Sequence, residues 1–186
     1  MTPKWGNIFV LCTGRCGSTT FTKAAEQIKN FTAGHETRTH LTGEDRFAYP
    51  RNHIEVDNRL SWLLGRLDKH FGATAFYVHL KRNPEQVAES FVKRSDRGIM
   101  LAYRTEILMR AGKLSRDTSM EDFAHDYIQT VNSNIDLFLK DKHSKMQFNL
   151  ENWECDFPKF WKAIGAEGCL QAAQKEFNIR HNASES

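Results

Sequence analysis

The stretch from Ile8 to Ile28, IFVLCTGRCGSTTFTKAAEQI, constrains the fold more than any other part of the sequence. A short apolar run leads into a loop with two glycines. Apolar residues then recur at helical spacing, at Phe21, Ala24, Ala25 and Ile28, which predicts a helix with one buried face. A strand, a glycine-rich loop and a helix in this order direct backbone N–H groups and the positive helix end at one place. The stretch therefore predicts a phosphate or sulfate site.

A second strand-to-helix junction follows later in the chain. The run ATAFYVHLK is rich in β-branched and aromatic residues and predicts a strand. Asn83, Pro84 and Glu85 then supply a helix cap, a proline for the first helical position and an acid for the first turn. Two such junctions with a helix between them predict a parallel sheet covered by helices on both faces. The predicted fold class is α/β.

The rest of the chain adds helices and one late strand. The segment HETRTHLTGEDRFAYPRNH is polar and rich in turn residues, so we expect an exposed loop there. The next helix is expected to have Asp57 or Asn58 at its start, Gly72 at its end and apolar residues at Leu60, Leu63, Leu64, Leu67 and Phe71. From Gly98 the pattern is helical, with a capping box expected at Thr118-x-x-Glu121. KMQFNLE predicts a strand, and two short helices follow.

Length and composition exclude several classes of protein. The 186 residues are 40% hydrophobic and 26% charged, which fits a single domain spanning residues 1–186. A net charge of +3 is too small to indicate a nucleic-acid partner, and without an apolar run of membrane length we expect a cytoplasmic chain. Neither a disulfide framework nor a metal site is predicted, because no CxxC or HExxH pattern accompanies the four cysteines, Cys12, Cys16, Cys155 and Cys169.

The first loop, TGRCGSTT, differs from the common nucleotide-binding loop. A Walker A loop places Lys after its last glycine, whereas here Gly17 is followed by Ser18 and the cation is Arg15. The loop resembles the phosphosulfate loop of sulfotransferases that use PAPS, 3′-phosphoadenosine 5′-phosphosulfate. The resemblance implies a P-loop-type sheet with a helical second half. It assigns the phosphosulfate to Arg15, Cys16, Gly17, Ser18, Thr19 and Thr20.

The second junction, FYVHLKRNPEQVAESFVKR, resembles the 3′-phosphate site of the same family. In that family an Arg at a strand end and a Ser eight residues later, on the following helix, bind the 3′-phosphate. Arg82 and Ser90 stand at this spacing. An Arg fork and a nearby hydroxyl suit a phosphate. Two separated motifs therefore carry the resemblance, which covers Ile8 to Arg94.

Sulfuryl transfer also needs a base for the acceptor hydroxyl and a cation for the leaving phosphate. Arg15 is the candidate cation. AGHETR resembles an element of tyrosylprotein sulfotransferases whose second Glu is the base, and this position is Glu36 here. His35 is the alternative, because other sulfotransferases use a His, and Asp57 is a third candidate. A Lys that aids catalysis in the tyrosylprotein enzymes has no clear counterpart, although Arg59 stands near its place.

The sequence thus predicts a PAPS-dependent sulfotransferase that releases PAP, the 3′,5′-bisphosphate, and acts on an acceptor hydroxyl of unspecified type. No metal, nucleic acid or membrane span is expected, and the sequence does not predict an oligomeric state. Two alternatives stay open: a P-loop nucleotide kinase and a non-catalytic nucleotide-binding module. The tail IRHNAS resembles that of related bacterial sulfotransferases, which puts Arg180 near the nucleotide.

Overall fold

The computed structural model describes residues 4–109, 118–179 and 181. Its centre is a five-stranded sheet in the order β2-β3-β1-β4-β5. The strands are β1 (Asn7–Leu11), β2 (Thr32–His35), β3 (His53–Val56), β4 (Phe76–Lys81) and β5 (Lys145–Asn149). Every neighbouring pair is parallel. The predicted α/β class with a parallel sheet is confirmed.

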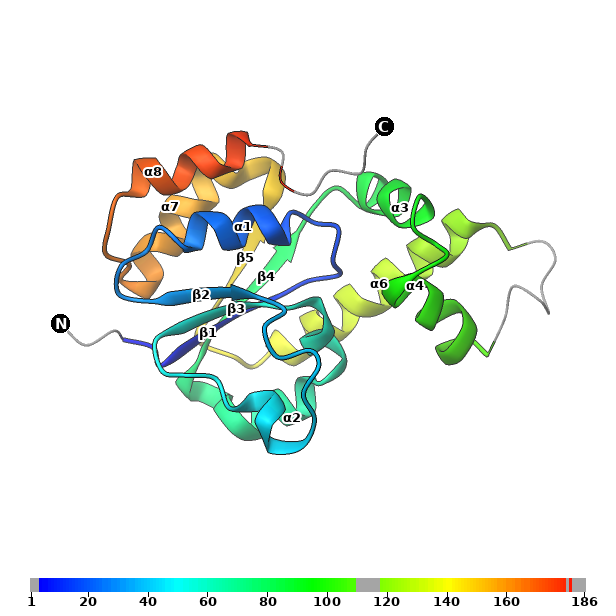
Figure 1. Cartoon of the computed structure of the whole chain (residues 1–186), viewed down its shortest axis with the longest axis horizontal. Coiled ribbons are helices and arrows are strands. Elements are labelled where there is room, and N and C mark those ends of the chain that lie inside the picture. The colour runs from blue at the N-terminus through cyan, green and yellow to red at the C-terminus, as the bar shows by residue number, and fades with distance from the viewer. Residues whose placement is uncertain (1–3, 110–117, 180, 182–186) are drawn as a thin grey trace.

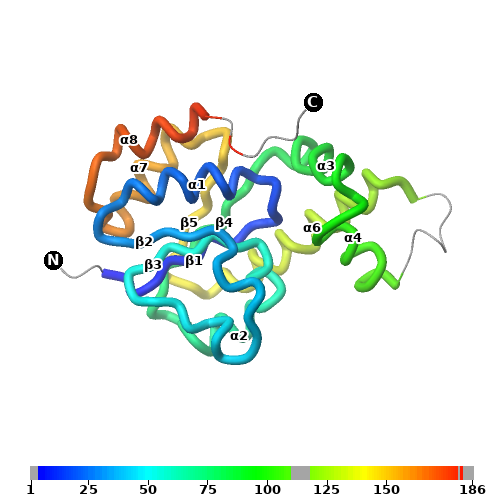
Figure 2. The backbone as a smooth tube through the Cα atoms, viewed as in Figure 1, coloured from blue at the N-terminus to red at the C-terminus, as the bar shows by residue number. Residues whose placement is uncertain are grey.

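Helices cover both faces of this sheet (Figures 1 and 2). The α1, α7 and α8 helices lie on one face, and α2 lies on the other. The helix α6 packs against α3 and β4. The helices are α1 (Ser18–Ala25), α2 (Leu64–Phe71), α3 (Pro84–Val92), α4 (Gly98–Ala102), α6 (Met120–Leu139), α7 (Trp153–Ile164) and α8 (Leu170–Lys175).

The segment of residues 35–53, expected to be an exposed loop, is largely irregular but is not exposed throughout. It contains the short helix η1 (Gly43–Phe47), which buries Arg46 and Phe47, and its last residue begins the strand β3. All four residues of β3 are buried, although His53 and Glu55 are polar. Its sequence, HIEV, alternates polar and apolar residues as strands do, but it is only four residues long and follows a polar, turn-rich stretch, so no strand is predicted there.

Three helices begin at residues whose side chains cap them. Asn83 accepts a hydrogen bond from the backbone of Gln86, with Pro84 in the first turn, as predicted. The capping box of α6 is formed by Ser119 and Asp122, one residue later than expected. Asp57 caps the short helix η2 (Asn58–Trp62), and α2 begins only after it.

The topology fixes where a ligand can bind. The chain leaves β1 toward β2 on one side and later returns to β4 on the other side of β1, so the strand order reverses there. In open α/β sheets, ligands bind beyond the carboxyl ends of the strands at such a point. Both predicted junctions, after β1 and after β4, open at this edge. Within residues 4–109, 118–179 and 181, no helix has the length and apolar character needed to cross a bilayer.

Candidate active site

A cavity of about 780 Å³ opens at the carboxyl edge of the sheet. It receives residues from the loop after β1, the end of β2, the start of η2, the helix α3 and the segments around α7 and α8. The side chains used below come from its lining, which includes Arg15, Ser18, His35, Glu36, Asn58, Arg82, Ser90, Leu150, Trp153 and Phe177. Segments far apart in sequence therefore share one binding space.

The loop after β1 is held in an unusual backbone conformation. Gly14, Arg15 and Gly17 have φ angles of 82°, 57° and 86°, in the left-handed region that favours glycine. A Cβ atom on Gly14 would lie 2.4 Å from Asn58 Nδ2, and one on Gly17 would lie 2.6 Å from Leu150 Cδ2. Both glycines are therefore favoured by backbone angle, and a side chain at either position would displace Asn58 or Leu150. The N-cap residue of α1 is Gly17, which has no side chain. No hydrogen bond from an N-cap side chain therefore occupies the first N–H groups of the helix.

Buried groups hold this loop through hydrogen bonds to its backbone. Tyr127 on α6 donates a 2.8 Å hydrogen bond to the carbonyl of Thr13, and Ser61 donates one of 3.1 Å to the carbonyl of Cys12. The Cys12 and Cys16 side chains are buried, and the hydrogen bond with Cys16 raises the pKa of Cys12. Cys16, which the resemblance assigns to the phosphosulfate, is not in the cavity lining.

The two predicted anion sites meet in the cavity. Arg15 Nε donates a 2.9 Å hydrogen bond to Ser90 Oγ, and Arg82 donates one of 3.3 Å to the Arg15 carbonyl. Arg82 also donates to Gln86. Burial, and then the charges of Arg94 and Arg82, lower the pKa of Arg15. Cationic groups that disfavour one another in this way are stabilised by an anion placed between them.

His35 and Glu36 end β2 and point to different partners. His35 Nε2 lies 3.0 Å from Ser18 Oγ, at the start of α1. Glu36 has a φ angle of 54°, and its Oε2 accepts a 2.5 Å hydrogen bond from Arg59. Both residues line the cavity. The third candidate base, Asp57, is fully buried and is not part of the lining.

One wall of the cavity is apolar and aromatic. Leu150, Trp153, Phe177 and Ile179 line it, and the rings of Trp153 and Phe177 stack with centroids 5.0 Å apart. The sequence analysis missed this wall because helical aromatic residues usually indicate core packing. His181 joins the lining, whereas Arg180 lies outside the described residues.

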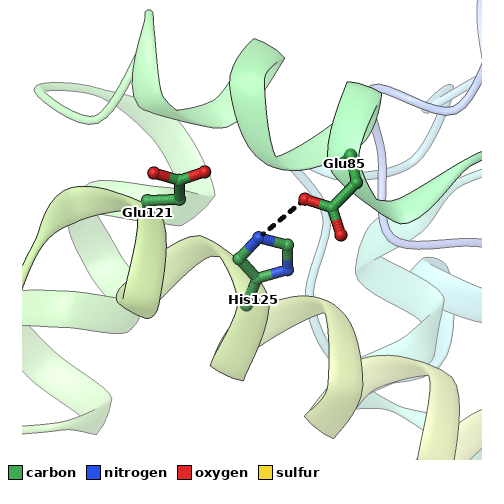
Figure 3. A group of neighbouring side chains, drawn as sticks. All are labelled: Glu85, Glu121 and His125. Carbon is green, nitrogen blue, oxygen red and sulfur yellow. Dashed lines mark ion pairs between the residues drawn. The ribbon is translucent and has the colours of Figure 1, made fainter.

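One group outside the cavity has metal-ligand chemistry. Glu85 on α3 faces Glu121 and His125 on α6, and their ligand atoms lie within 4.8 Å of one another (Figure 3). His125 Nε2 is 3.3 Å from Glu85 Oε2. Both carboxylates are exposed, and none of the three residues lines the cavity. This group is therefore separate from the candidate active site, for which no metal was expected.

Sequence comparison gives no relative for this chain: no protein-family model matches it, and no curated protein is similar to it. Solved structures do match. The sulfotransferase domain from the curacin biosynthetic pathway aligns with a TM-score of 0.60 and 15% identity, over 88% of this chain and 75% of that one. A sulfotransferase from Alicyclobacillus acidocaldarius aligns with a TM-score of 0.53 and 10% identity, over 97% and 84%.

Mouse sulfotransferase SULT7A1, crystallised with PAP, aligns with a TM-score of 0.57 and 13% identity, over 93% of this chain. The chain has the sulfotransferase fold. It spans 64% of SULT7A1, so part of that enzyme has no counterpart here. The fold resemblance predicted from the loop after β1 and from Arg82 and Ser90 is thus found in the whole architecture.

Proposed function

We propose that the chain is a sulfotransferase that moves the sulfuryl group of PAPS to an acceptor hydroxyl. The observation that carries the proposal is the meeting of two motifs 75 residues apart, where Arg15 Nε contacts Ser90 Oγ at 2.9 Å. A ligand with two anionic groups suits a cavity that brings a helix start with Arg15 next to Arg82 and Ser90. The cavity volume, about 780 Å³, lies within the usual range of roughly 300–1,000 Å³ for such sites.

The lining gives each part of PAPS a chemically matched place. The start of α1, with Ser18, Thr19 and Thr20, would hold the 5′-phosphosulfate through N–H and hydroxyl donors. Arg82 and Ser90 would hold the 3′-phosphate. The apolar wall containing Trp153 offers a stacking surface for adenine. These assignments extend the fold likeness to a particular ligand.

The chemistry follows from the charges around the phosphosulfate. Glu36 takes the proton of the acceptor hydroxyl as the acceptor oxygen bonds to sulfur, and the bond from sulfur to the bridging oxygen breaks. The electron pair of that bond stays on the phosphate of PAP. Arg15 and the first N–H groups of α1 stabilise the negative charge that grows there.

Glu36 suits the role of base better than His35 does. His35 faces Ser18 at the helix start, beside the place proposed for the sulfuryl donor. Glu36 lines the cavity and contacts Arg59 instead of the helix start. Asp57 is buried against Arg46 and is not in the cavity lining. We therefore assign the proton transfer to Glu36.

Calorimetry with three nucleotides tests the choice of ligand. PAP is expected to bind at least 10-fold more tightly than AMP, because AMP lacks the 3′-phosphate and its charge-assisted contacts are worth roughly 1.5–3 kcal/mol each. Equal affinity for PAP and AMP would remove the proposed 3′-phosphate site. Tight binding of Mg-ATP with weak binding of PAP would favour the P-loop kinase instead.

A turnover assay tests the reaction itself. Labelled PAPS is offered with a phenol, a tyrosine-containing peptide, a primary alcohol and a monosaccharide, with water as the reference acceptor. Transfer of label above the protein-free rate supports the enzyme. Tight PAP binding without transfer to any acceptor or to water would indicate a non-catalytic nucleotide-binding module.

A further inference from the structure

Two acids at the carboxyl end of β3 are fully buried, which requires an explanation. Glu55 on β3 and Asp57, which caps η2, have no exposed surface, although carboxylates are almost never fully buried unless they are paired. The two acids have different partners. Neither acid lines the cavity. Their hydrogen bonds show what they hold.

Glu55 holds the turn that carries Glu36. Its carboxyl oxygens accept two hydrogen bonds from Thr37, one from the backbone N–H and one from the hydroxyl, both of 2.7 Å. His53 Nε2 lies 2.9 Å from the same carboxyl group. Thr37 follows Glu36 directly, and Glu36 is in the left-handed region, which is unfavourable for a non-glycine residue. The bonds to Glu55 help to offset that cost.

Asp57 holds the partner of Glu36. Its Oδ1 accepts a 2.8 Å hydrogen bond from the backbone N–H of Arg59, and its Oδ2 is bound by the buried Arg46 at 2.5 Å. Arg59 in turn donates the 2.5 Å hydrogen bond to Glu36. Glu55 therefore holds the turn that carries Glu36, and Asp57 holds the backbone of Arg59. Each acid supports one member of the Glu36–Arg59 ion pair.

We infer that Glu55 and Asp57 are positioning residues for the reaction, each fixing one member of the Glu36–Arg59 pair, of which Glu36 lines the cavity. The inference rests on the proposed function, since it needs Glu36 as the base. Geometry gives the reason: a misplacement of about 1 Å can slow a reaction by about 100-fold. A pair held by two buried acids avoids such misplacement.

A double-mutant cycle tests this coupling. Glu55→Gln and Asp57→Asn are each expected to lower kcat by about 10- to 100-fold while PAP affinity, measured by calorimetry, changes less than about twofold. The rate is measured with the best acceptor of the panel above, or with water. Because Glu55 acts through Glu36, adding Glu55→Gln to Glu36→Gln should cause little further loss. Glu44→Gln, an exposed acid on η1, is the matched control and should leave kcat unchanged.

The possible failures are distinguishable. If Glu36→Gln alone has normal turnover, the proposed base is wrong. If Glu36→Gln is slow but Glu55→Gln and Asp57→Asn are not, or if the losses in the double mutant multiply in full, the positioning role is wrong and the proposed function stands. Thr37→Val covers the case in which Glu55→Gln does not fold. It removes only the hydroxyl donor, so it should lower kcat by a smaller factor, and an unchanged kcat would count against the inference.

Discussion

The two sides of the cavity differ in charge and in how they are built. The nucleotide side, formed by the junctions after β1 and β4, carries cations and hydroxyls on helix starts, among them Arg15, Arg82 and Ser90. The acid side, formed by the ends of β2 and β3, carries Glu36 above buried Glu55. Cations bind the anionic sulfuryl donor, whereas an ionised carboxylate can accept a proton. The comparison therefore predicts that variants on the acid side alter rate, and that variants on the nucleotide side alter mainly affinity, except at Arg15, which also meets the leaving phosphate.

The largest expected effect belongs to the acid side. Glu36→Gln should slow sulfuryl transfer by about 10² to 10⁴-fold, the usual contribution of a positioned base, and leave PAP affinity almost unchanged. The amide keeps the size of the side chain but cannot accept the proton. Steady-state kinetics with labelled PAPS and calorimetry with PAP measure the two quantities separately.

His35→Ala is the companion variant to Glu36→Gln. Its effect should be milder, because His35 contacts Ser18 and not the acceptor side. If His35→Ala were inactive and Glu36→Gln active, the base would be His35 and not Glu36. If both variants stay active, Asp57 becomes the next candidate, and the resemblance to the tyrosylprotein enzymes is limited to the nucleotide site.

The variant Arg15→Ala tests whether the nucleotide side contributes only to binding or also to the rate. If it stabilises the charge that grows on the leaving phosphate, Arg15→Ala should lower kcat by about 10²- to 10³-fold, more than it weakens PAP binding. Arg97→Ala, an exposed arginine with a side chain 69% accessible, is the control. In the structure Arg15 contacts Ser90, so equal losses in kcat and affinity would instead assign Arg15 to the 3′-phosphate.

The nucleotide side was predictable because its constraints are local. Gly14 and Gly17 are needed for left-handed turns, Asn83 and Pro84 begin a helix, and each requirement falls within a few adjacent residues. The parallel sheet followed from the same junctions. Local rules of this kind can be derived from one sequence.

The acid side and the aromatic wall depend on contacts that the sequence does not display. Glu55 reads as a polar residue in a loop, and only the pairing of β3 between β1 and β2 shows that it is buried. Trp153 has the spacing of a core residue and reaches the cavity because α7 packs beside α1. The alternation of apolar Ile54 and Val56 with Glu55 and Asp57 was the available signal. It extends over too few residues to predict a strand with a buried acid.

A smaller effect than those on rate is expected at the second junction. Arg82→Ala should weaken PAP binding by about 10- to 150-fold, which corresponds to roughly 1.5–3 kcal/mol for a charge-assisted contact. AMP affinity should change much less, because AMP has no 3′-phosphate. Calorimetry with both nucleotides gives the ratio, and an equal loss for PAP and AMP would contradict the assignment of Arg82.

The smallest expected effect concerns stability and lies outside both sides of the cavity. His79 on β4 is 2% exposed and contacts Asp136 and Asn132 on α6. Burial, followed by the charge of Lys81, lowers the pKa of His79 from its ordinary value of 6.5, although the two α6 partners act in the opposite direction. Well above pH 6.5 the imidazole is neutral in both the folded and the unfolded chain.

Below pH 6.5 the unfolded chain takes up the proton more readily than the folded chain does, so the free energy of unfolding should fall as the pH decreases. One proton sets the upper limit of this slope at ~1.4 kcal/mol per pH unit. Urea unfolding at pH 7.5 and 5.5 should show a smaller pH effect for His79→Gln than for the wild-type chain, whereas the exposed His143→Gln should behave like wild type. Because His79 does not line the cavity, PAP affinity at pH 7.5 should be unchanged in His79→Gln. If His79→Gln and wild type lost stability in parallel, the buried imidazole would not be the titrating group, and a loss of PAP affinity would tie β4 to the nucleotide side through more than Arg82.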